Sequence, residues 1–461
     1  MEQERKTYYF LGIGGIGMSA IARYLNMQGH RVLGYDRVAT ELTKKLEAEG
    51  IQINYEDREE NIPAGIDLCI YTPAIPESNI QFERIKASGV LMEKRSVALG
   101  HITKNKKVIA ISGSHGKTTT CGMITHILSY STVGCSAFLG GILKSVNNNF
   151  VFNNNSPYVV VEADEYDRSF LQLSPYISVI TSIDADHLDI YQNYENLHKA
   201  FEDFALLTNN RGQLIVKTER KEIIEKLREK KPLSTYALND IEADTYAWNI
   251  RIYKGSYYFD LNDYGETFFD LQMNYPGRHN IENAVVAMKV CNFVLKQEGI
   301  SKSKREEILR QALSTFSGMK RRLDYIINND RQIFIDDYAH HPKEIEATIL
   351  SLKELYPNKQ LTGIFQPHLY SRTKDLAKEF AKSLELLDSV ILLPIYPARE
   401  EPIKGVTSHL IMQNINKMDK YYVSKEQLYP LLEALQPELL LTMGAGDIDR
   451  EIDKIKQILS K

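Results

Sequence analysis

Short apolar runs alternate along the chain with longer stretches in which apolar residues recur every three or four positions. The runs predict buried strands, and the stretches between them predict helices. In the first half of the chain the predicted strands are 8–13, 31–35, 67–71, 108–111, 158–161, 178–183 and 214–216. Near the C-terminus they are 332–335, 361–365, 390–393, 421–423 and 439–443. Strands that alternate with helices predict parallel sheets covered on both faces, so we expect an α/β protein.

Two stretches break this alternation, and two others mark boundaries. Residues 253–273 alternate aromatic and polar side chains, which predicts antiparallel strands at a sheet edge. The Asn-rich stretch 147–155 predicts a surface turn. A polar linker at 103–107 and a basic segment near 320–322 then divide the chain into three units, 1–105, 106–322 and 323–461.

The composition is that of a globular protein able to bury real cores, with 43% hydrophobic and 25% charged residues. The 56 basic and 60 acidic residues give a net charge of −4, which offers no electrostatic case for nucleic acid or an anionic membrane as partner. The four cysteines form no CxxC pair and are expected to be reduced thiols. No signal-peptide pattern and no 18-residue apolar run occurs, so we expect a cytoplasmic chain without membrane spans.

The strongest local motif is Gly113-x-x-Gly116-Lys117-Thr118, between a predicted strand and a predicted helix. A glycine-rich turn exposes N–H donors to phosphates, and the helix N-terminus adds partial positive charge. Lysine at this place can reach the β- and γ-phosphates, and the threonine hydroxyl can ligate Mg²⁺. The usual pattern has a further glycine where Ile111 stands. The alternative is a tight turn that arose by chance.

Acidic residues follow two other predicted strands. The strand at 158–161 runs into Glu162-Ala163-Asp164-Glu165, and carboxylates at such a strand end are what hard cations prefer. By itself this could be a solvated strand end. The second cluster, 184–189, places His187 between acids, where it either binds a metal or has a structural role. Ligands gather at the carboxyl ends of parallel strands, which favours a site.

Near the N-terminus, Gly12-x-Gly14-x-x-Gly17 is followed 19 residues later by Asp36. This spacing matches the dinucleotide fingerprint and by itself suggests NAD. The physical requirement is a diphosphate at a helix N-terminus and an acid near a ribose. A UDP-sugar meets that requirement equally well.

The third unit carries two polar clusters, each at the end of a predicted strand. They are Asp336-Asp337-Tyr338-Ala339-His340-His341-Pro342 and Gln366-Pro367-His368-Leu369-Tyr370-Ser371-Arg372. Packing alone explains such clusters poorly. A further cluster at 277–283 opens a predicted helix, and by themselves Asn280 and Asn283 would be a helix cap and a surface polar residue.

The motifs GIGGIGMS, GSHGKTT, EADE, DADHLD, GRHNIEN, RR, DDYAHHP and GAGDI follow one another along the whole chain. In this order they resemble the Mur ligase family. The resemblance implies a Rossmann-like N-terminal domain, a central P-loop-type ATPase domain and a Rossmann-like C-terminal domain. It also implies an ATP-dependent, Mg²⁺-dependent ligase that forms amide bonds through an acyl phosphate in peptidoglycan synthesis.

Within the family, DDYAHHP, FQPHLYSRT and the segment 444–448 are similar to those of members that join L-alanine to the lactyl carboxylate of UDP-N-acetylmuramate. The alternative is a recycling ligase that attaches a whole murein tripeptide to the same sugar nucleotide. Either reading implies small-molecule substrates and a monomer or homodimer.

The resemblance also implies roles for individual residues. For the UDP-sugar they are Gly12, Gly14, Gly15, Gly17, Asp36 and Thr72. For ATP they are Gly113, Ser114, His115, Gly116, Lys117, Thr118, Thr119, His279, Asn283, Arg322 and Asp337. For the metal they are Thr118, Glu162 and His187, with Lys117, Glu162 and His187 as the catalytic group. For L-alanine they are Tyr338, His340 and Arg372.

Two departures from the family pattern stand out. Some members carry an arginine where this chain has Leu369, and several use a carbamylated lysine near the place of Phe201 and Lys199, to which we assign no modification. Two other classes of function remain open. A nicotinamide dehydrogenase would leave the P-loop unexplained, and a non-catalytic nucleotide-binding regulator would not need Glu162 and His187.

Overall fold

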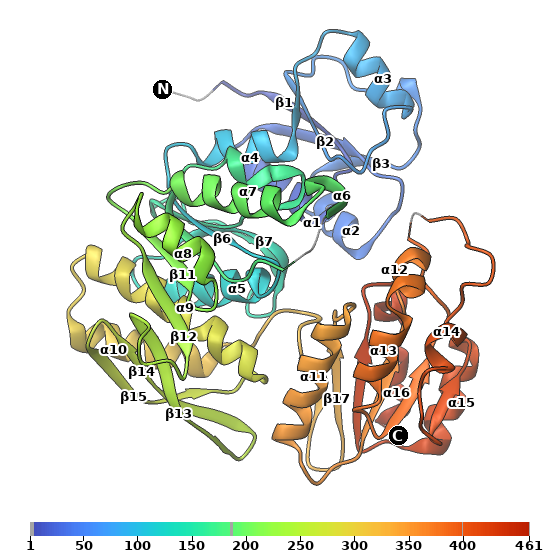
Figure 1. The fold of residues 1–461 in the computed structure, drawn as a ribbon. Coiled ribbons are helices and arrows are strands. Elements are labelled where there is room, and N and C mark those ends of the chain that lie inside the picture. The colour runs from blue at the N-terminus through green and yellow to red at the C-terminus, as the bar shows by residue number, and fades with distance from the viewer. Residues whose placement is uncertain (1–3, 185–187, 399, 461) are drawn as a thin grey trace. The chain divides into compact units, whose positions relative to one another are not determined.

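Three β-sheets with helices packed against them organise the chain (Figure 1). The computed structural model describes residues 4–184, 188–398 and 400–460. The sheets contain five, ten and six strands in chain order. Strands alternate with helices over most of the sequence, so the expected α/β class with three sheet-containing domains is confirmed.

The first sheet is entirely parallel, with strand order β3-β2-β1-β4-β5. Its strands are β1 (Thr7–Leu11), β2 (Arg31–Tyr35), β3 (Gln52–Asn54), β4 (Leu68–Tyr71) and β5 (Met92–Lys94). Its helices are α1 (Ile16–Met27), α2 (Glu41–Ala48), η1 (Glu59–Asn61), α3 (Ile80–Ala87) and α4 (Arg95–Thr103). The strand order reverses between β1 and β4, and ligands bind at the carboxyl edge of such a switch point.

The second sheet has the order β15-β14-β13-β12-β11-β10-β6-β9-β7-β8. Its strands are β6 (Lys107–Ser112), β7 (Ser136–Leu143), β8 (Asn148–Val151), β9 (Tyr158–Glu162), β10 (Pro175–Ile180), β11 (Gln213–Lys217), β12 (Ser234–Leu238), β13 (Thr245–Tyr253), β14 (Ser256–Asp263) and β15 (Glu266–Met273). Its helices are α5 (Lys117–Tyr130), η2 (Tyr166–Gln172), α6 (Leu188–Tyr191), α7 (Tyr194–Leu206), α8 (Lys221–Arg228), α9 (Arg278–Gln297) and α10 (Lys302–Thr315). Strand β6 lies between β10 and β9 and is parallel to both.

Two details of this sheet differ from the sequence-based expectation. The strand expected at 178–183 is β10, which ends at Ile180 because Thr181 and Ser182 leave the ladder and bind the loop after β6. The surface turn expected at 147–155 is wrong for residues 148–151, which form β8. Asn149 in β8 is fully buried. Its side-chain amide tolerates burial because it accepts a hydrogen bond from Arg23 Nη1 and donates one to Ile16 O.

The third sheet has the order β16-β17-β21-β18-β19-β20, with only β16 antiparallel. Its strands are β16 (Asp324–Asn328), β17 (Ile333–Asp337), β18 (Leu361–Phe365), β19 (Ser389–Leu392), β20 (Lys420–Tyr422) and β21 (Leu439–Met443). Its helices are α11 (Pro342–Leu355), α12 (Tyr370–Asp375), α13 (Ala377–Leu384), α14 (His409–Met412), α15 (Lys425–Leu435), η3 (Asp447–Glu451) and α16 (Ile452–Leu459). Neighbouring residues such as Ile364 and Phe365 enter different apolar clusters, because side chains alternate across a strand.

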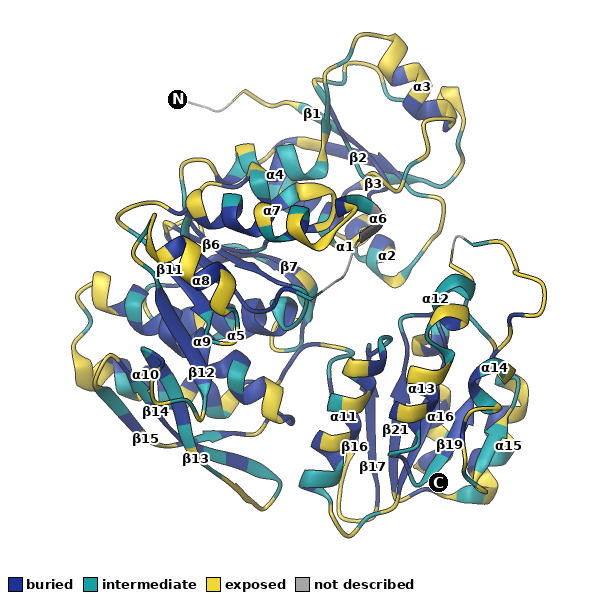
Figure 2. Ribbon diagram, viewed as in Figure 1, coloured by how far each residue is buried: buried dark blue, intermediate teal, exposed yellow. Residues whose placement is uncertain are grey.

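By contacts the chain forms two compact units. The first comprises Met1–Trp248, Asp260–Phe269 and Glu282–Leu313, and the second comprises Asn249–Phe259, Asp270–Ile281 and Ser314–Lys461. In the first unit one apolar cluster runs from α1 to β7 and β8, where the Tyr24 ring packs 5.7 Å from Phe138 and 6.3 Å from Phe150. The first sheet and the parallel part of the second therefore share a core, and their strands are buried (Figure 2).

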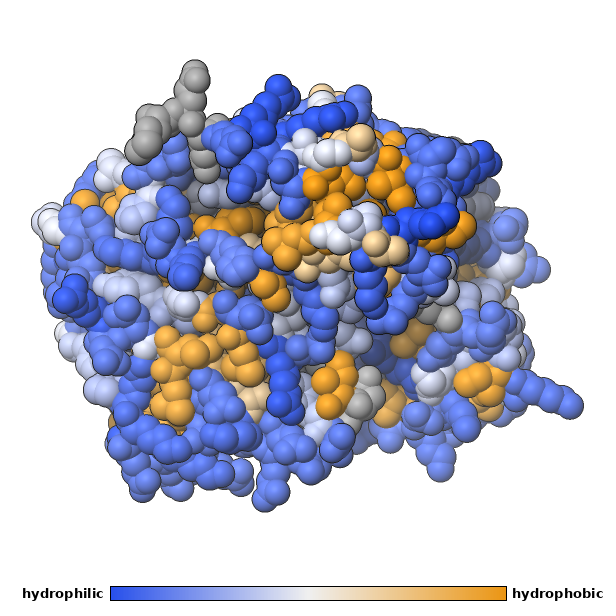
Figure 3. Space-filling view, turned by 90° about the horizontal axis from the view of Figure 1, so that it is seen from above, coloured by the Kyte–Doolittle hydropathy of each residue, from blue (hydrophilic) through white to orange (hydrophobic). Residues whose placement is uncertain are grey.

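All four cysteines are free and buried, as expected for reduced thiols. Across the described part of the chain, no helix combines the length and the apolar character that a membrane crossing requires. Hydrophilic residues cover most of the face drawn in Figure 3, and hydrophobic residues on that face form separate patches. Scattered apolar side chains of this kind are normal on protein surfaces.

Candidate functional site

The loop between β6 and α5 has a backbone that only glycine adopts easily. Gly113 has φ of 128° and Gly116 has φ of 82°. A Cβ at Gly113 would lie 2.2 Å from Thr181 Oγ1, and one at Gly116 would lie 2.5 Å from Asn283 Oδ1. The structure therefore places Asn283 against the loop between β6 and α5.

The start of the 184–189 cluster lies on the same loop. Ser114 N donates to Ser182 O at 3.0 Å, and His115 N donates to Ser182 Oγ at 2.9 Å. Ser114 Oγ accepts from Asp184 N at 2.9 Å, and His115 Nε2 lies 3.4 Å from Asp184 Oδ2. The loop is thus held from the side by residues 181–184. His187 lies outside the described residues.

Lys117, the first residue of α5, is bound by a carboxylate that the sequence reading quoted without a role. Its ammonium donates to Gly113 O at 2.6 Å and to both oxygens of Glu165 at 2.8 and 2.9 Å. Burial raises the pKa of Glu165, whose side chain is 2% exposed, and the Lys117 ammonium opposes that rise. Burial opposes ionisation of Lys117 as well, but Glu165 and Glu162 together raise the pKa of Lys117. The only sequence signal for Glu165 is its place at the end of EADE.

Thr118 and Glu162 meet beside this pair. Thr118 Oγ1 donates to the Glu162 oxygens at 3.0 and 2.9 Å, and Gly140 N donates to Glu162 Oε2 at 3.1 Å. Thr119 is buried in the same turn of α5. Among the described residues no group of three or more His, Cys, Asp or Glu side chains is arranged to hold a metal. A hydroxyl and a carboxylate nevertheless fit Mg²⁺, which usually keeps several waters and binds substrate phosphates through one or two carboxylates.

The glycine turn after β1 is shaped by Asp36. Gly14 N donates to Asp36 Oδ2 at 2.8 Å, and Val38 N donates to Asp36 Oδ1 at 3.2 Å. Asp36 therefore binds the backbone of the turn, a role that the fingerprint spacing did not indicate. Gly15 is the N-cap of α1 and gives no side-chain cap, so the first N–H groups of this helix face an uncapped end. Such an end attracts anions.

Gly12 and Thr72 complete this turn. Gly12 has φ of 85°, and a Cβ there would lie 2.5 Å from Thr72 Cγ2. Thr72 N donates to Leu11 O at 3.3 Å, which places Thr72 at the carboxyl end of β4 beside the end of β1. Gly17 stands in the first turn of α1. The six residues expected to bind the UDP-sugar thus gather at one edge of the first sheet.

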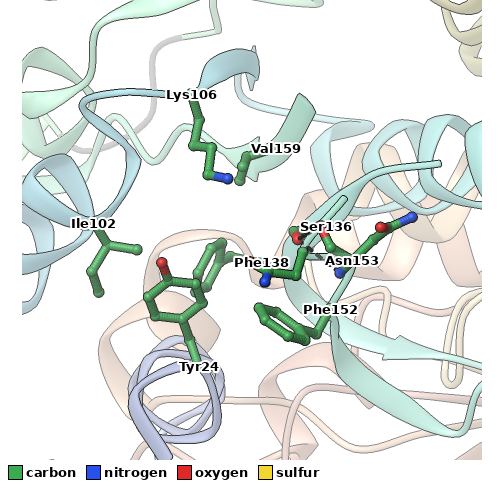
Figure 4. Close-up of a pocket in the computed structure, with 9 residues that line it drawn as sticks. Tyr24, Ile102, Lys106, Ser136, Phe138, Phe152, Asn153 and Val159 are labelled. Carbon is green, nitrogen blue, oxygen red and sulfur yellow. Dashed lines mark hydrogen bonds between the residues drawn. The ribbon is translucent and has the colours of Figure 1, made fainter. Parts of the chain in front are cut away.

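A pocket elsewhere in the first unit contains none of the candidate residues (Figure 4). It is lined by Tyr24, Ile102, Lys106, Ser136, Phe138, Phe152, Asn153, Asn154 and Val159. Lys106 precedes β6, and Ser136 begins β7. The pocket therefore lies at the amino ends of these strands, whereas the loop with Lys117 follows the carboxyl end of β6.

In the second unit the expected L-alanine residues lie near the ends of β17 and β18. The Tyr338 and His340 rings are 5.4 Å apart, and the His340 and His368 rings are 6.2 Å apart. Arg372, in α12, has a buried Nη1 atom without a hydrogen-bond partner among the described residues. Burial lowers the pKa of His340, and the nearby Arg372 lowers it further. Neutral imidazole, aromatic ring and guanidinium therefore share one location.

His368 belongs to this group, although sequence reasoning gave it no role. Its Nδ1 atom is buried and has no hydrogen-bond partner in the described part of the chain. Burial lowers the pKa of His368 to about 4, and its ring stacks on Tyr396 at 5.8 Å. The signal available in the sequence was its position just after the strand at 361–365. Tyr396 carried no comparable signal, because it comes from a segment without a recognisable motif.

Leu369, where some family members have arginine, adopts φ of 72° and ψ of 137°, an unusual backbone for a residue with a side chain. The next residue but one, Ser371, donates its backbone N–H to Glu400 Oε2 at 2.9 Å. Strained backbone of this kind clusters at functional sites. No hydrogen bond of the Leu369 side chain can replace an arginine contact, because leucine has no polar side-chain atom.

Arg322 and Asp337 hold the segment that precedes the third sheet. Asp337 is buried and accepts from Leu323 N at 2.6 Å and from Ala339 N at 2.7 Å. Burial raises the pKa of Asp337 to about 6, and Arg322 opposes that rise. The Arg322 guanidinium lies 5.1 Å from the centre of the Tyr338 ring. Both residues therefore act on the backbone and ring beside the expected L-alanine residues.

Three remaining residues have simpler surroundings. His279 lies in the first turn of α9, where a Cβ on Gly277 would approach it to 2.7 Å. Phe201 is fully buried, with its ring 5.4 Å from Phe170. Lys199 is exposed and pairs with Asp203 at 2.8 Å. The place considered for a carbamylated lysine is thus an aromatic core contact with an exposed, ion-paired lysine two residues before it.

Comparison with known proteins gives full-length similarities. The family models described as Mur ligase family, catalytic domain, as Mur ligase middle domain and as Mur ligase, glutamate ligase domain match residues 7–107, 111–291 and 321–446. The chain is 44% identical over 458 residues to the UDP-N-acetylmuramate–L-alanine ligase of Parabacteroides distasonis, covering 98% of this chain and 97% of that one. It is 44% identical over 462 residues to the ligase of the same name from Christiangramia forsetii, covering 98% of each chain.

Solved structures show a similar fold. The crystal structure of the UDP-N-acetylmuramate-alanine ligase from Thermotoga maritima matches with a TM-score of 0.82 and 28% identity, covering 98% of each chain. A murein peptide ligase from Psychrobacter arcticus matches with a TM-score of 0.68 and 22% identity, covering 99% of this chain and 98% of that one. The second likeness shows a shared fold alone.

Proposed function

The chain belongs to the Mur ligase family, and from that premise we propose that it joins L-alanine to the lactyl carboxylate of UDP-N-acetylmuramate, with ATP consumed to ADP and phosphate, in peptidoglycan synthesis. The observation that best supports the ligase activity is the contact between the glycine-rich loop before α5 and the acidic end of β9. There Thr118 donates a hydrogen bond to Glu162. The full-length relatives that carry the L-alanine ligase name support L-alanine over a tripeptide as the amine substrate.

The reaction activates a carboxylate. The lactyl carboxylate attacks the γ-phosphate of ATP, which gives an acyl phosphate and ADP. The amine of L-alanine then adds to the acyl carbon, and the tetrahedral intermediate collapses with loss of phosphate. The chain contributes positioning and charge neutralisation to these steps, as is usual for phosphoryl transfer.

Lys117 and the N-terminus of α5 bind the ATP phosphates in this proposal. Gly113, Ser114, His115 and Gly116 present the backbone of the loop, and Asn283 lies against Gly116. Thr118 and Glu162 would hold Mg²⁺, with His187 as a further ligand, and the ion would neutralise charge on the phosphates. His279, Arg322 and Asp337 are proposed to complete the nucleotide site.

The diphosphate of the UDP-sugar is placed on the uncapped N-terminus of α1, and Asp36 keeps the glycine turn in shape. The carboxylate of L-alanine is placed on Arg372, whose planar fork can hold it with two charge-assisted hydrogen bonds. His340 and His368, uncharged because burial lowers their pKa, then lie beside a cationic amine without repelling it. The unpartnered buried nitrogens of Arg372 and His368 support a polar ligand at this location.

Several broader features belong to the same proposal. We divide the chain into a UDP-sugar domain at 1–105, an ATP domain at 106–322 and an amino-acid domain at 323–461. We place the protein in the cytoplasm, where its two nucleotide substrates are available, as a monomer or homodimer. Exclusion of water from the bound acyl phosphate would prevent its hydrolysis.

Phosphate release in the presence of ATP, Mg²⁺ and UDP-N-acetylmuramate tests the function directly. L-alanine, glycine, L-serine and the tripeptide L-Ala-γ-D-Glu-meso-diaminopimelate are offered in turn. We expect the highest kcat/KM with L-alanine. Preferential use of the tripeptide contradicts the substrate assignment, and absence of phosphate release with every amine contradicts the ligase activity.

A further inference from the structure

Arg95 stands between two segments of the first unit that are far apart in sequence. It is the first residue of α4 and directly follows β5, at the carboxyl edge of the first sheet, where the glycine turn also lies. Its Nη1 atom lies 2.7 Å from the position of a Cβ on Gly17. Its Nη2 atom donates to Asp164 Oδ2 at 3.3 Å. The guanidinium therefore touches the turn with one edge and the acidic segment after β9 with the other.

Gly17 leaves room for this contact, because it has no side chain. In the dinucleotide fingerprint the third glycine permits close packing of the helix on a strand. In this chain the space left by the missing side chain of Gly17 is filled by Arg95, whose Cδ and Cζ atoms would lie 3.2 and 3.4 Å from a Cβ. A side chain at Gly17 would push the guanidinium away from the first turn of α1.

Most of the hydrogen-bonding capacity of Arg95 is unused. A guanidinium has five N–H donors, and within the described residues Asp164 is the one hydrogen-bond partner of this side chain. The side chain is 24% exposed, so its remaining donors are accessible to a ligand. Arginine presents its donors in a planar fork that matches phosphate oxygens. The donors on the Gly17 edge lie beside the uncapped end of α1.

We propose that Arg95 binds the diphosphate of the sugar nucleotide with the edge that faces Gly17, while its other edge stays on Asp164. This inference rests on the proposed function in one respect, the placement of a nucleoside diphosphate at the glycine turn. It adds a substrate-binding residue from α4 to a site otherwise built from the turns after β1, β2 and β4. One side chain then joins the diphosphate to the acidic segment that begins at Glu162.

Lys94 provides a matched control. It precedes Arg95 and pairs with Asp167 at 2.9 Å, so it also links the first sheet to the segment after β9. Both partners of this pair are substantially exposed. Lys94→Met therefore removes a cation and a link between the same two segments, and leaves the guanidinium beside Gly17 in place.

The experiment is a calorimetric titration of UDP into the full-length chain without ATP, for the parent, Arg95→Gln, Arg95→Lys and Lys94→Met. Loss of hydrogen bonds to a charged group should raise the Kd of Arg95→Gln for UDP about 10- to 150-fold. Arg95→Lys keeps the charge and loses the fork, so we expect a smaller increase in Kd. Lys94→Met should stay within about threefold of the parent, since exposed pairs contribute little. Thermal unfolding of each variant checks that it is folded.

Unchanged UDP affinity in Arg95→Gln overturns the inference, above all if the KM for ATP rises, because Arg95 would then serve Asp164 alone. If Arg95→Gln fails to fold, parental UDP affinity in Arg95→Lys overturns it as well. A parent chain that does not bind UDP also overturns it. A chain that binds UDP through Arg95 but releases no phosphate with UDP-N-acetylmuramate and L-alanine contradicts the proposed function and leaves this inference standing.

Discussion

Glu162, at the end of β9, accepts hydrogen bonds from both a hydroxyl and a backbone amide, and it is the carboxylate that we propose as a metal ligand. Glu162→Gln keeps the shape of the side chain and its amide oxygen as acceptor, but removes the charge. We expect kcat to fall about 100-fold or more, the range for loss of one preorganised electrostatic group, with the melting temperature nearly unchanged. The measurement is phosphate release at saturating Mg²⁺.

Asp203→Asn is the matched control for Glu162→Gln, because it removes an exposed carboxylate that pairs with Lys199 on α7. Its turnover should equal that of the parent. Near-normal turnover in Glu162→Gln at high Mg²⁺ would show that the metal does not depend on this carboxylate.

Arg372 is the proposed partner of the L-alanine carboxylate. Arg372→Lys keeps the charge and loses the planar fork, which amounts to about 1.5 to 3 kcal/mol for a hydrogen bond to a charged group. The KM for L-alanine should therefore rise about 10- to 150-fold, with the KM for ATP unchanged. Lys374→Met, at an exposed position of the same helix, is the control. A loss of stability in Arg372→Lys without a change in the KM for L-alanine would mean that Arg372 only supports α12.

Residue types and spacing point to Lys117, Thr118 and Glu162 from the sequence alone, because neighbours along the chain define their motifs. Glu165, Arg95 and His368 received no role at that stage. Their importance depends on partners such as Lys117, Gly17 and Tyr396, which are distant in sequence and meet them only in the fold. Asp36 has the expected position, but its carboxylate binds the backbone of the turn.

At the scale of elements, the glycine turn before α1 contains one position where a side chain can be added without disturbing the turn itself. A Cβ on Gly14 would lie 2.7 Å from Thr43 and 2.8 Å from Asp36, so a side chain there disturbs the turn itself. At Gly15 the nearest atom is Gly12 O at 3.4 Å, and φ is −64°, which alanine adopts freely. Gly15→Ala should fold and still block close approach of a diphosphate. We expect the KM for the UDP-sugar to rise about 10- to 100-fold, as for a small misplacement of substrate.

The KM for ATP serves as the internal reference for Gly15→Ala, because ATP is proposed to bind the other loop. Equal increases in both values would point to a general defect. Measurable affinity of the parent chain for NAD would contradict the UDP-sugar assignment altogether.

Asp337, at the end of β17, binds the segment before β16, and we expect its contribution to the free energy of unfolding to depend on pH. Burial raises the pKa of Asp337 from 3.8 to about 6. Between these pH values the folded chain binds more protons than the unfolded chain, so the contribution of this carboxyl to stability is greatest below pH 4 and declines as the pH rises through 6. The decline amounts to about 3 kcal/mol. Asp337→Asn cannot ionise and should lack it.

Free energies of unfolding of the parent and Asp337→Asn, measured from pH 4 to pH 7, test this expectation. The amide also loses one of the two hydrogen bonds from Leu323 N and Ala339 N, which lowers stability by an amount that does not change with pH. The difference between the two curves should therefore shrink as the pH rises. Parallel curves would show that Asp337 titrates normally in the fold.

Most of the predicted strands lie within two residues of a strand in the structure, because short apolar runs between turn residues define them. The strand at 361–365 agrees with the structure at both ends. β8 was missed because it lies in an Asn-rich stretch, and the sequence does not show that the side-chain amide of Asn149 is hydrogen-bonded to Arg23 and Ile16 in α1. β10 was placed too far along the chain, since the apolar run continues into Thr181–Ile183, which binds the neighbouring loop instead.

At the scale of the whole molecule, the sequence predicts three α/β sheets through its repeated alternation of strands and helices. It does not predict the order of strands within a sheet. That order depends on where each strand is added to the sheet after the helix that precedes it. The insertion of β21 between β17 and β18, and of β6 between β10 and β9, therefore appears only in the structure. These two placements bring together the ends of strands that are far apart in sequence, and with them the candidate residues.

Lys117 is paired with Glu165, so Glu165 would compete with phosphate for the ammonium that we propose to bind ATP. On that proposal a nucleotide must displace Glu165 from the ammonium. Its apparent affinity then equals the intrinsic affinity multiplied by the fraction of molecules in which Lys117 and Glu165 are separated. Glu165→Gln weakens the competitor, and the Kd for ADP should fall below that of the parent in an equilibrium titration. A higher Kd would mean that Glu165 orients Lys117 and does not compete with phosphate. If Glu165 competes with phosphate, nucleotide binding is weaker than it would be without Glu165, but the Lys117 ammonium has a carboxylate partner when no nucleotide is bound.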